Sequence, residues 1–237
     1  MDGEVLPQVA KLGGIALDLI FPQKCIGCGK EGLVLCSSCQ ASLPAIKPPL
    51  CPLCGRPQSS GILCPGCVSW RASIDGIRSP FRFEDTVQQA VYQLKYRNLR
   101  ILAGPLAGLM RDYLSENDIP GDVLVPVPLH KKRLRERGYN QSVLLAKHLG
   151  KLAGLPVVDN CLVRRLHTPP QARTANVEER RNNIEGAFAC RDESLNGRKV
   201  LLIDDVSTSG ATLDACADVL KEAGAKSVWG LTLAREI

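Results

Sequence analysis

The sequence contains few aromatic residues, few histidines and no hydrophobic run long enough to cross a membrane. Phe, Tyr and Trp make up 4% of the 237 residues, so side chains that could stack on nucleic-acid bases are scarce. The three histidines, His130, His148 and His167, do not have the spacing of a metal site. The apolar stretch 15–21 is interrupted by Asp18 and falls far short of the roughly 18 residues of a membrane span. The sequence therefore predicts no membrane insertion.

The N-terminus also lacks the features of an export signal. Residues 1–14 have no basic start, and no small-residue cleavage site follows the apolar stretch. We therefore expect a cytoplasmic protein, in which thiols stay reduced. Its composition, with 45% hydrophobic and 23% charged residues, is that of a globular protein and excludes disorder, collagen and a coiled coil.

Cysteine, by contrast, is abundant and clustered. Of 11 cysteines, eight form two quartets with the spacings C-x2-C-x7-C-x2-C and C-x2-C-x9-C-x2-C: Cys25, Cys28, Cys36 and Cys39, then Cys51, Cys54, Cys64 and Cys67. Four thiolates with no open position predict two structural Zn²⁺ sites, and Gly29 and Gly55 suit the left-handed turn of such knuckles. An iron–sulfur cluster on the same thiolates and disulfides are the disfavoured alternatives. Sequential pairing needs only short hairpins, while an interleaved pairing of the first C-x2-C with the third stays open.

The composition changes along the chain and suggests three parts. Residues 1–20 predict an N-terminal helix. Residues 21–70 are rich in Cys, Pro and Gly and cannot bury a core alone, so we assign them to a double zinc ribbon. Residues 71–237 alternate between apolar strands and amphipathic helices, which predicts an α/β domain with a mainly parallel sheet. The expected strands are 77–83, 122–127, 199–203 and 227–233, and the expected helices are 86–96, 101–115, 141–152 and 211–223.

The most informative segment runs from Val200 to Thr212. An apolar strand ends in Asp204 and Asp205, and a loop rich in small hydroxyl residues then opens a helix. Backbone N–H groups at such a turn suit a phosphate monoester, and the two carboxylates suit ribose hydroxyls and hydrated Mg²⁺. A plain helix N-cap with surface acids is the simpler alternative, disfavoured by the density of hydroxyl and Gly residues. No Gly-Lys-Ser/Thr follows, which excludes a P-loop.

Positive charge is concentrated in one segment. The chain carries a formal net charge of +6, but residues 131–181 hold 12 Lys or Arg against 4 Asp or Glu. A basic segment of this kind indicates an anionic partner: phosphate, pyrophosphate or nucleic acid.

The 200–212 segment resembles the phosphoribosyl-pyrophosphate (PRPP) motif of type I phosphoribosyltransferases. Further segments resemble one branch of these proteins, the ComF family, which is named for competence and DNA uptake. They are 94–97, 125–130, 133–141, 165–171 and 179–188. With the cysteine quartets, the resemblance covers nearly the whole chain. It implies a type I phosphoribosyltransferase fold preceded by a small zinc-ribbon domain.

The resemblance also implies a set of site residues and a reaction. Asp204 and Asp205 would be the catalytic carboxylates that orient the ribose, with Mg²⁺ bound alongside PRPP. A mobile lid would lie at 166–176, and a plain surface loop is the alternative for this segment. A nitrogen nucleophile would displace pyrophosphate from the anomeric carbon. The 5′-phosphate would bind Ser207, Thr208, Ser209, Gly210, Ala211 and Thr212, and the pyrophosphate would bind Lys95, Pro128, Leu129, His130, Arg133 and Arg137.

A rival hypothesis is a non-catalytic PRPP or nucleotide sensor that binds single-stranded DNA through its basic surface and zinc ribbons. Other competence or DNA-uptake proteins would then be its partners. Against it, Tyr139 is the single aromatic residue in 131–181. No base-recognition pocket can be named from the sequence under either hypothesis.

Overall fold

The structure is a computed structural model that describes residues 23–166, 184 and 186–237. The chain divides into two compact units, Met1–Leu43 and Pro44–Ile237. This division runs through the segment assigned to the double zinc ribbon, so the second cysteine quartet belongs to the same unit as the α/β domain. The expected helix 1–20 and most of the expected lid 166–176 lie outside the described residues.

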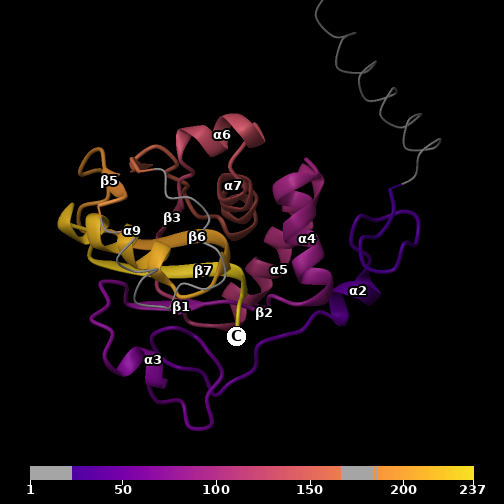
Figure 1. The fold of residues 1–237 in the computed structure, drawn as a ribbon, viewed down its shortest axis with the longest axis horizontal. Helices are drawn as coiled ribbons and strands as arrows, with labels where there is room; N and C mark the ends of the chain where they lie inside the picture. Colours follow the sequence, from indigo (N-terminus) through magenta and orange to yellow (C-terminus); the bar gives the residue numbers. More distant parts are fainter. Residues whose placement is uncertain (1–22, 167–183, 185) are drawn as a thin grey trace, which may run out of the picture. The chain divides into compact units, whose positions relative to one another are not determined.

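A parallel sheet forms the centre of the second unit, in the strand order β1-β7-β6-β3 (Figure 1). The short strand β2 pairs with β7 beyond β1, and every pairing in this sheet is parallel. The strands are β1 (Gly76–Arg78), β2 (Phe81–Arg82), β3 (Val123–Pro126), β6 (Lys199–Ser207) and β7 (Ser227–Arg235). Near-continuous apolar runs such as those in β3 and β6 are typical of strands covered on both faces. The predicted parallel sheet is confirmed.

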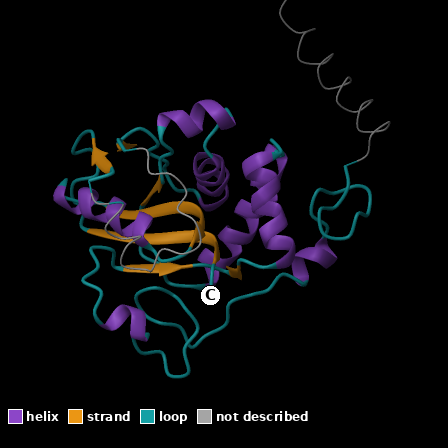
Figure 2. Cartoon of the chain, in the orientation of Figure 1, coloured by secondary structure: helices purple, strands orange, loops and turns teal. Residues whose placement is uncertain are grey.

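Helices and a hairpin surround this sheet (Figure 2). Helix α7 packs on β3 and β6, and α9 packs on β7 and on the hairpin strand β5. The helices are α4 (Asp85–Tyr96), α5 (Ala103–Glu116), α6 (Lys131–Arg137), α7 (Gln141–Ala153) and α9 (Ala211–Glu222), with a 3-10 turn η1 (Arg100–Leu102) before α5. Strands β4 (Leu162–Arg164) and β5 (Phe188–Cys190) pair antiparallel, and α2 (Ser37–Ala41) and α3 (Pro65–Val68) are single turns within the cysteine-rich region.

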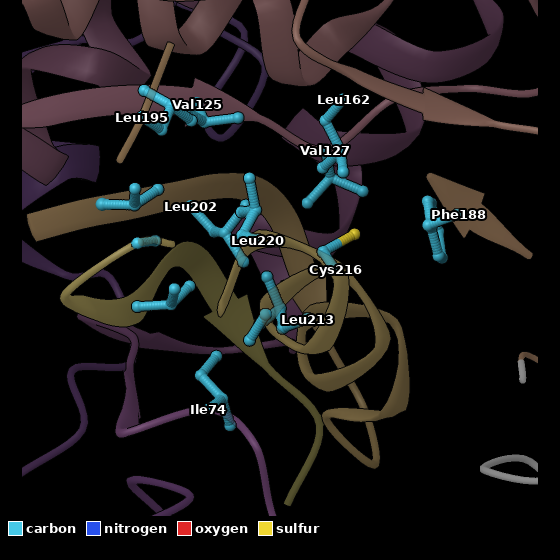
Figure 3. Packing of buried hydrophobic residues seen from close by; sticks show 14 of the residues in the cluster. Ile74, Val125, Val127, Leu162, Phe188, Leu195, Leu202, Leu213, Cys216 and Leu220 are labelled. Atoms are coloured by element: carbon cyan, nitrogen blue, oxygen red, sulfur yellow. The ribbon is translucent and has the colours of Figure 1, made fainter. Parts of the chain in front are cut away.

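Alternation of side chains along the strands fills both sides of the sheet. Val125 and Leu202 point to the face covered by α9, where they meet Cys216 and Leu220 (Figure 3). Leu124, the neighbour of Val125, lies near Gly150 of α7 on the other face. The result is a three-layer α/β/α arrangement, which leaves the carboxyl ends of the strands as the open edge where ligands bind such sheets.

A carboxylate on α9 fixes the segment that follows the second cysteine quartet. Asp214 accepts hydrogen bonds from Trp70 Nε1 (3.1 Å), Ser73 N (2.8 Å) and Ile74 N (2.9 Å). The ribbon region is therefore joined to the first turn of α9 through one side chain.

Replacing Asp214 by alanine should destabilise this unit strongly. Three donors lose their acceptor, which costs about 3 kcal/mol in the free energy of unfolding and lowers the melting temperature by roughly 10 °C. Asp218→Ala is the matched control, because Asp218 accepts from the hydroxyl of Ser73 (2.7 Å) at an exposed position. Thermal unfolding of both variants measures the difference, and equal losses would contradict the anchoring role of Asp214.

Candidate functional site

The two predicted carboxylates lie together near the carboxyl end of β6. Asp205 is 2% exposed and forms an ion pair with Lys95 of α4, with Nζ 2.8 Å from Oδ1. Ser142 in the first turn of α7 donates its hydroxyl to Asp204 Oδ1 over 2.7 Å. The second oxygen of Asp205, Oδ2, is buried and has no hydrogen-bond partner among the described residues. A buried carboxylate oxygen in this state requires a donor or a cation.

The ionisation of this pair is unusual. Burial and the neighbouring charge of Asp205 raise the pKa of Asp204 to about 7, although Lys95 and Ser142 act in the opposite direction. Near neutral pH the site therefore holds less negative charge than two carboxylates normally carry, and a bound cation would favour full ionisation.

The phosphate loop follows immediately. Strand β6 extends through Ser207, four residues beyond the predicted end, and α9 begins at Ala211 as expected. Gly210 has a φ of +82°, and a Cβ there would lie 2.8 Å from Ile77 Cδ1 and 2.9 Å from the Trp70 ring. The turn thus requires glycine for both its conformation and its packing. The loop leads into the N-terminus of the twelve-residue helix α9. Backbone N–H groups and the positive end of the helix dipole therefore act at the same place, which favours a bound anion.

One residue at this loop was not predicted from the sequence. Arg235, the last residue of β7, is 2% exposed and donates from Nη2 to Thr208 O over 3.3 Å. Its Nη1 lies 3.5 Å from Ser207 Oγ. The sheet register brings Arg235 opposite Ser207, and no local sequence pattern indicates that pairing.

The loop after β3 is supported by α7. Asn140 caps α7 by accepting from Ser142 N (2.9 Å), and its amide donates to Val127 O (2.9 Å). His130, predicted to contact pyrophosphate, caps α6 through Nδ1, which accepts from Lys132 N (3.2 Å). Its predicted ligand contact remains a prediction.

The structure brings three of the predicted pyrophosphate residues into one cavity. Lys95, Arg133 and Arg137 line a cavity of about 410 Å³. Its other lining residues are Tyr96, Asn98, Arg100, Glu136 and Tyr139. Pro128 and Leu129 line a separate cavity of about 330 Å³.

Two tyrosines far apart in the sequence share the first of these cavities. The guanidinium of Arg137 lies 5.4 Å over the ring of Tyr96, and that of Arg100 lies 4.4 Å over the ring of Tyr139. Tyr96 and Tyr139, which are distant in the sequence, therefore line the same cavity as Lys95, and each ring is covered by an arginine.

The cysteines form the two predicted quartets in sequential order. The sulfur atoms of Cys25, Cys28, Cys36 and Cys39 lie within 4.8 Å of one another, and so do those of Cys51, Cys54, Cys64 and Cys67. Cys28 Sγ and Cys36 Sγ are 3.7 Å apart, as are Cys54 Sγ and Cys64 Sγ. A tetrahedral zinc site with Zn–S bonds near 2.3 Å requires about 3.8 Å, so both quartets fit Zn²⁺. The interleaved pairing is wrong, because the sulfur atoms gather within each sequential quartet. The disulfide alternative is wrong as well, because none of the eleven cysteines is joined to another.

In each quartet, one sulfur is favoured as a thiolate by the same kind of backbone contact. Cys36 N donates to Cys25 Sγ, and Cys64 N donates to Cys51 Sγ, each over 3.4 Å. Although burial opposes ionisation, backbone N–H donors lower the pKa of both Cys25 and Cys51 to about 6.

Comparison with known proteins agrees with this geometry. A double zinc ribbon domain matches residues 16–68, and a phosphoribosyl transferase domain matches residues 140–236. The competence protein ComFC of Bacillus subtilis (strain 168) is 34% identical over 209 residues, covering 85% of this chain and 84% of that protein. The chain belongs to the ComF family. Competence protein F of Haemophilus influenzae is 31% identical over 233 residues, covering 90% of this chain and 98% of that protein.

A third relative of this ComF-family chain is the DNA utilization protein YhgH of Escherichia coli (strain K12). It is 27% identical over 209 residues, covering 86% of this chain and 91% of that protein. These matches confirm the predicted family and fold class, a phosphoribosyltransferase domain preceded by zinc ribbons. The matched transferase domain of this ComF-family chain includes Asp204, Asp205 and the 207–212 loop but not Lys95 or Arg133. Among the described residues, no helix has the length and apolar character needed to cross a bilayer.

Proposed function

We propose that the protein binds PRPP with Mg²⁺ and transfers its phosphoribosyl group to a nitrogen nucleophile, releasing pyrophosphate. One observation carries this proposal: a carboxylate pair, with Asp205 buried and Asp204 half-buried, at the carboxyl end of a central parallel strand, followed directly by a hydroxyl-rich turn at a helix N-terminus. This combination suits a phosphate and a ribose held next to each other.

The ligand would be divided between two groups of residues. Residues 207–212 would hold the 5′-phosphate through backbone N–H groups and hydroxyls. Asp204 and Asp205 would hold the ribose hydroxyls and Mg²⁺, because Asp205 Oδ2 is a buried acceptor in need of a partner. When bound, Mg²⁺ would supply positive charge to the pyrophosphate.

The chemistry would rest on positioning and electrostatics. The bond from the anomeric carbon to a pyrophosphate oxygen breaks, and a bond to the nucleophile's nitrogen forms. The nitrogen's proton passes to water, and the bonding electrons leave with the pyrophosphate. Asp204 and Asp205 would stabilise positive charge developing on the ribose. Lys95, Arg133 and Arg137 line the cavity beside them and would neutralise the departing pyrophosphate.

The names of the relatives support a biological setting for this reaction. Because those names refer to competence and DNA utilization, we propose that the reaction serves the handling of imported DNA, together with other competence proteins. Sixteen charged residues in 131–181, twelve of them basic, support the second candidate: a non-catalytic PRPP sensor that binds single-stranded DNA. Reduced metal thiolates fit the cytoplasm.

Calorimetric titration of the full-length protein with PRPP and MgCl₂ tests the proposal. We expect saturable binding by the wild type, loss of about tenfold or more in affinity for Asp204→Asn and Asp205→Asn, and no change for the exposed Asp218→Asn. Absence of binding by the wild type would overturn the proposal.

A screen of acceptor bases for pyrophosphate release then separates the two candidates. Release that Asp205→Asn abolishes supports the transferase. PRPP binding without release from any acceptor favours the sensor. Salt-dependent DNA binding that survives Asp205→Asn but weakens when Lys131, Lys132 and Arg135 become alanine would also favour the sensor.

A further inference from the structure

Arg235 joins the second cysteine quartet to the phosphate loop. Its Nη1 donates to the backbone carbonyl of Cys54, a predicted zinc ligand, and its Nη2 donates to Thr208 O. All four cysteines of this quartet are at most 4% exposed, and Arg235 is 2% exposed. A single buried guanidinium therefore contacts both sites.

A buried cation in this position needs compensating negative charge. A Zn²⁺ ion with four thiolates carries a net charge of −2, so a loaded second quartet supplies a counter-charge to Arg235. Through its contact with Thr208 O, Arg235 also places a positive charge next to the loop that is expected to hold a phosphate.

A second link connects the same two sites through strand β1. Ile77 N donates to Leu53 O over 2.7 Å, which attaches the Cys51–Cys54 knuckle to the strand. The side chain of Ile77 packs against Gly210 in the phosphate loop, where it lies 2.8 Å from the position of a Cβ. The backbone of the Cys51–Cys54 knuckle is thus connected to the phosphate loop in two ways, through the side chain of Ile77 and through the guanidinium of Arg235.

We propose that the second zinc site positions the phosphate loop, with Arg235 as the positioning residue, so that zinc and a phosphoribosyl ligand bind with positive coupling. This proposal rests on the proposed function, since PRPP is its ligand. Coupling is reciprocal: zinc in the second quartet strengthens PRPP binding, and PRPP slows zinc loss from the second quartet. The first quartet, which has the same chemistry but belongs to the other compact unit, is its internal control.

Zinc release from the full-length protein tests this coupling without any variant. The purified chain should contain two zinc ions, and a chromogenic chelator that does not bind Mg²⁺ follows their release. Cys28→Ser and Cys64→Ser, each expected to retain one zinc, assign the two phases to the two quartets. With PRPP and MgCl₂ present, we expect release from the second quartet to slow about fivefold or more and release from the first to stay unchanged.

Variants at Arg235 test the route of the coupling. Arg235→Met should weaken PRPP binding about tenfold and remove the effect of PRPP on zinc release. Arg82→Met is the matched control, because Arg82 pairs opposite Arg235 in β2 but is exposed. If Arg235→Met does not fold, the wild-type release experiment still decides whether zinc and PRPP binding are coupled.

The possible outcomes separate this proposal from the proposed function. If the wild type binds PRPP and zinc release from the second quartet is unaffected, the coupling is overturned and the proposed function stands. If the wild type does not bind PRPP, the proposed function fails, and the same release assay with ribose 5-phosphate tests the phosphate-loop link. Fewer than two zinc ions per wild-type chain would overturn the metal assignment itself.

Discussion

Replacing Asp204 by asparagine should stabilise the free protein while weakening its binding of PRPP and Mg²⁺. In the free protein the half-buried Asp204 must ionise beside Asp205, and burial together with that neighbouring charge raises its pKa to about 7. Asparagine removes that charge and leaves Ser142 an acceptor. The ligand, however, loses a carboxylate for its ribose or metal. We expect a gain of about 3 °C or more in melting temperature at pH 8 and a loss of about tenfold in affinity.

The sign of the pH dependence follows from the direction of the shift. The folded pKa of about 7 lies above the ordinary value of 3.8, so the unfolded chain ionises Asp204 first. The wild type therefore loses stability relative to Asp204→Asn as the pH rises from about 4 towards 8. Below pH 4 both forms carry a neutral group and the difference vanishes. Melting temperatures at pH 5 and pH 8 measure this trend.

Asp205→Asn provides the contrasting control. Its carboxylate pairs with Lys95 over 2.8 Å, so the substitution leaves a partly buried ammonium without its partner. This variant should lose stability at pH 8, where Asp204→Asn gains it. A fall in the melting temperature of Asp204→Asn at pH 8 would contradict the charge repulsion assigned to the pair.

Periodicity predicted the parts of the fold whose side chains face a core. The helix expected at 86–96 is α4, because burial of one face imposes a helical period on its apolar residues. The strand expected at 122–127 is β3, because burial on both faces makes it a short continuous apolar run. Helix α6 was not predicted, since none of its seven residues is buried and its sequence is almost entirely charged. Strands β4 and β5 are three residues each, too short for an alternating pattern, and lie far apart in the chain.

The candidate site was predicted in its local parts and missed in its long-range ones. One continuous segment holds Asp204, Asp205 and the loop to Thr212, so their combination of carboxylates and hydroxyls could be recognised in the sequence. Arg235 reaches that loop only through the register of β6 with β7. Likewise Tyr96 and Tyr139 meet in one cavity because α4 and the α6–α7 turn lie side by side. Contacts of this kind depend on the tertiary fold, so they cannot be predicted from the spacing of residues in the sequence.

Replacing Gly55 by alanine should be far more damaging than replacing Gly29. Both glycines follow the second cysteine of a knuckle, and both have left-handed backbones, with φ of +71° and +74° respectively. A Cβ at Gly29 meets nothing within 4 Å, so Gly29→Ala has only the conformational cost of about 1 kcal/mol. A Cβ at Gly55 would lie 2.4 Å from the carbonyl oxygen of Ile77, a backbone atom that cannot turn aside.

The substitution at Gly55 therefore forces the second knuckle away from β1. The hydrogen bond from Ile77 N to Leu53 O (2.7 Å) is lost with it, and the total cost reaches about 3 kcal/mol or more, roughly 10 °C in melting temperature. Thermal unfolding with zinc release recorded in parallel assigns the loss to the second quartet. Equal effects of the two substitutions would show that the second knuckle does not pack on the sheet. A large difference would mean that two knuckles with the same sequence pattern play different parts, one of them built into the domain that carries the phosphate loop.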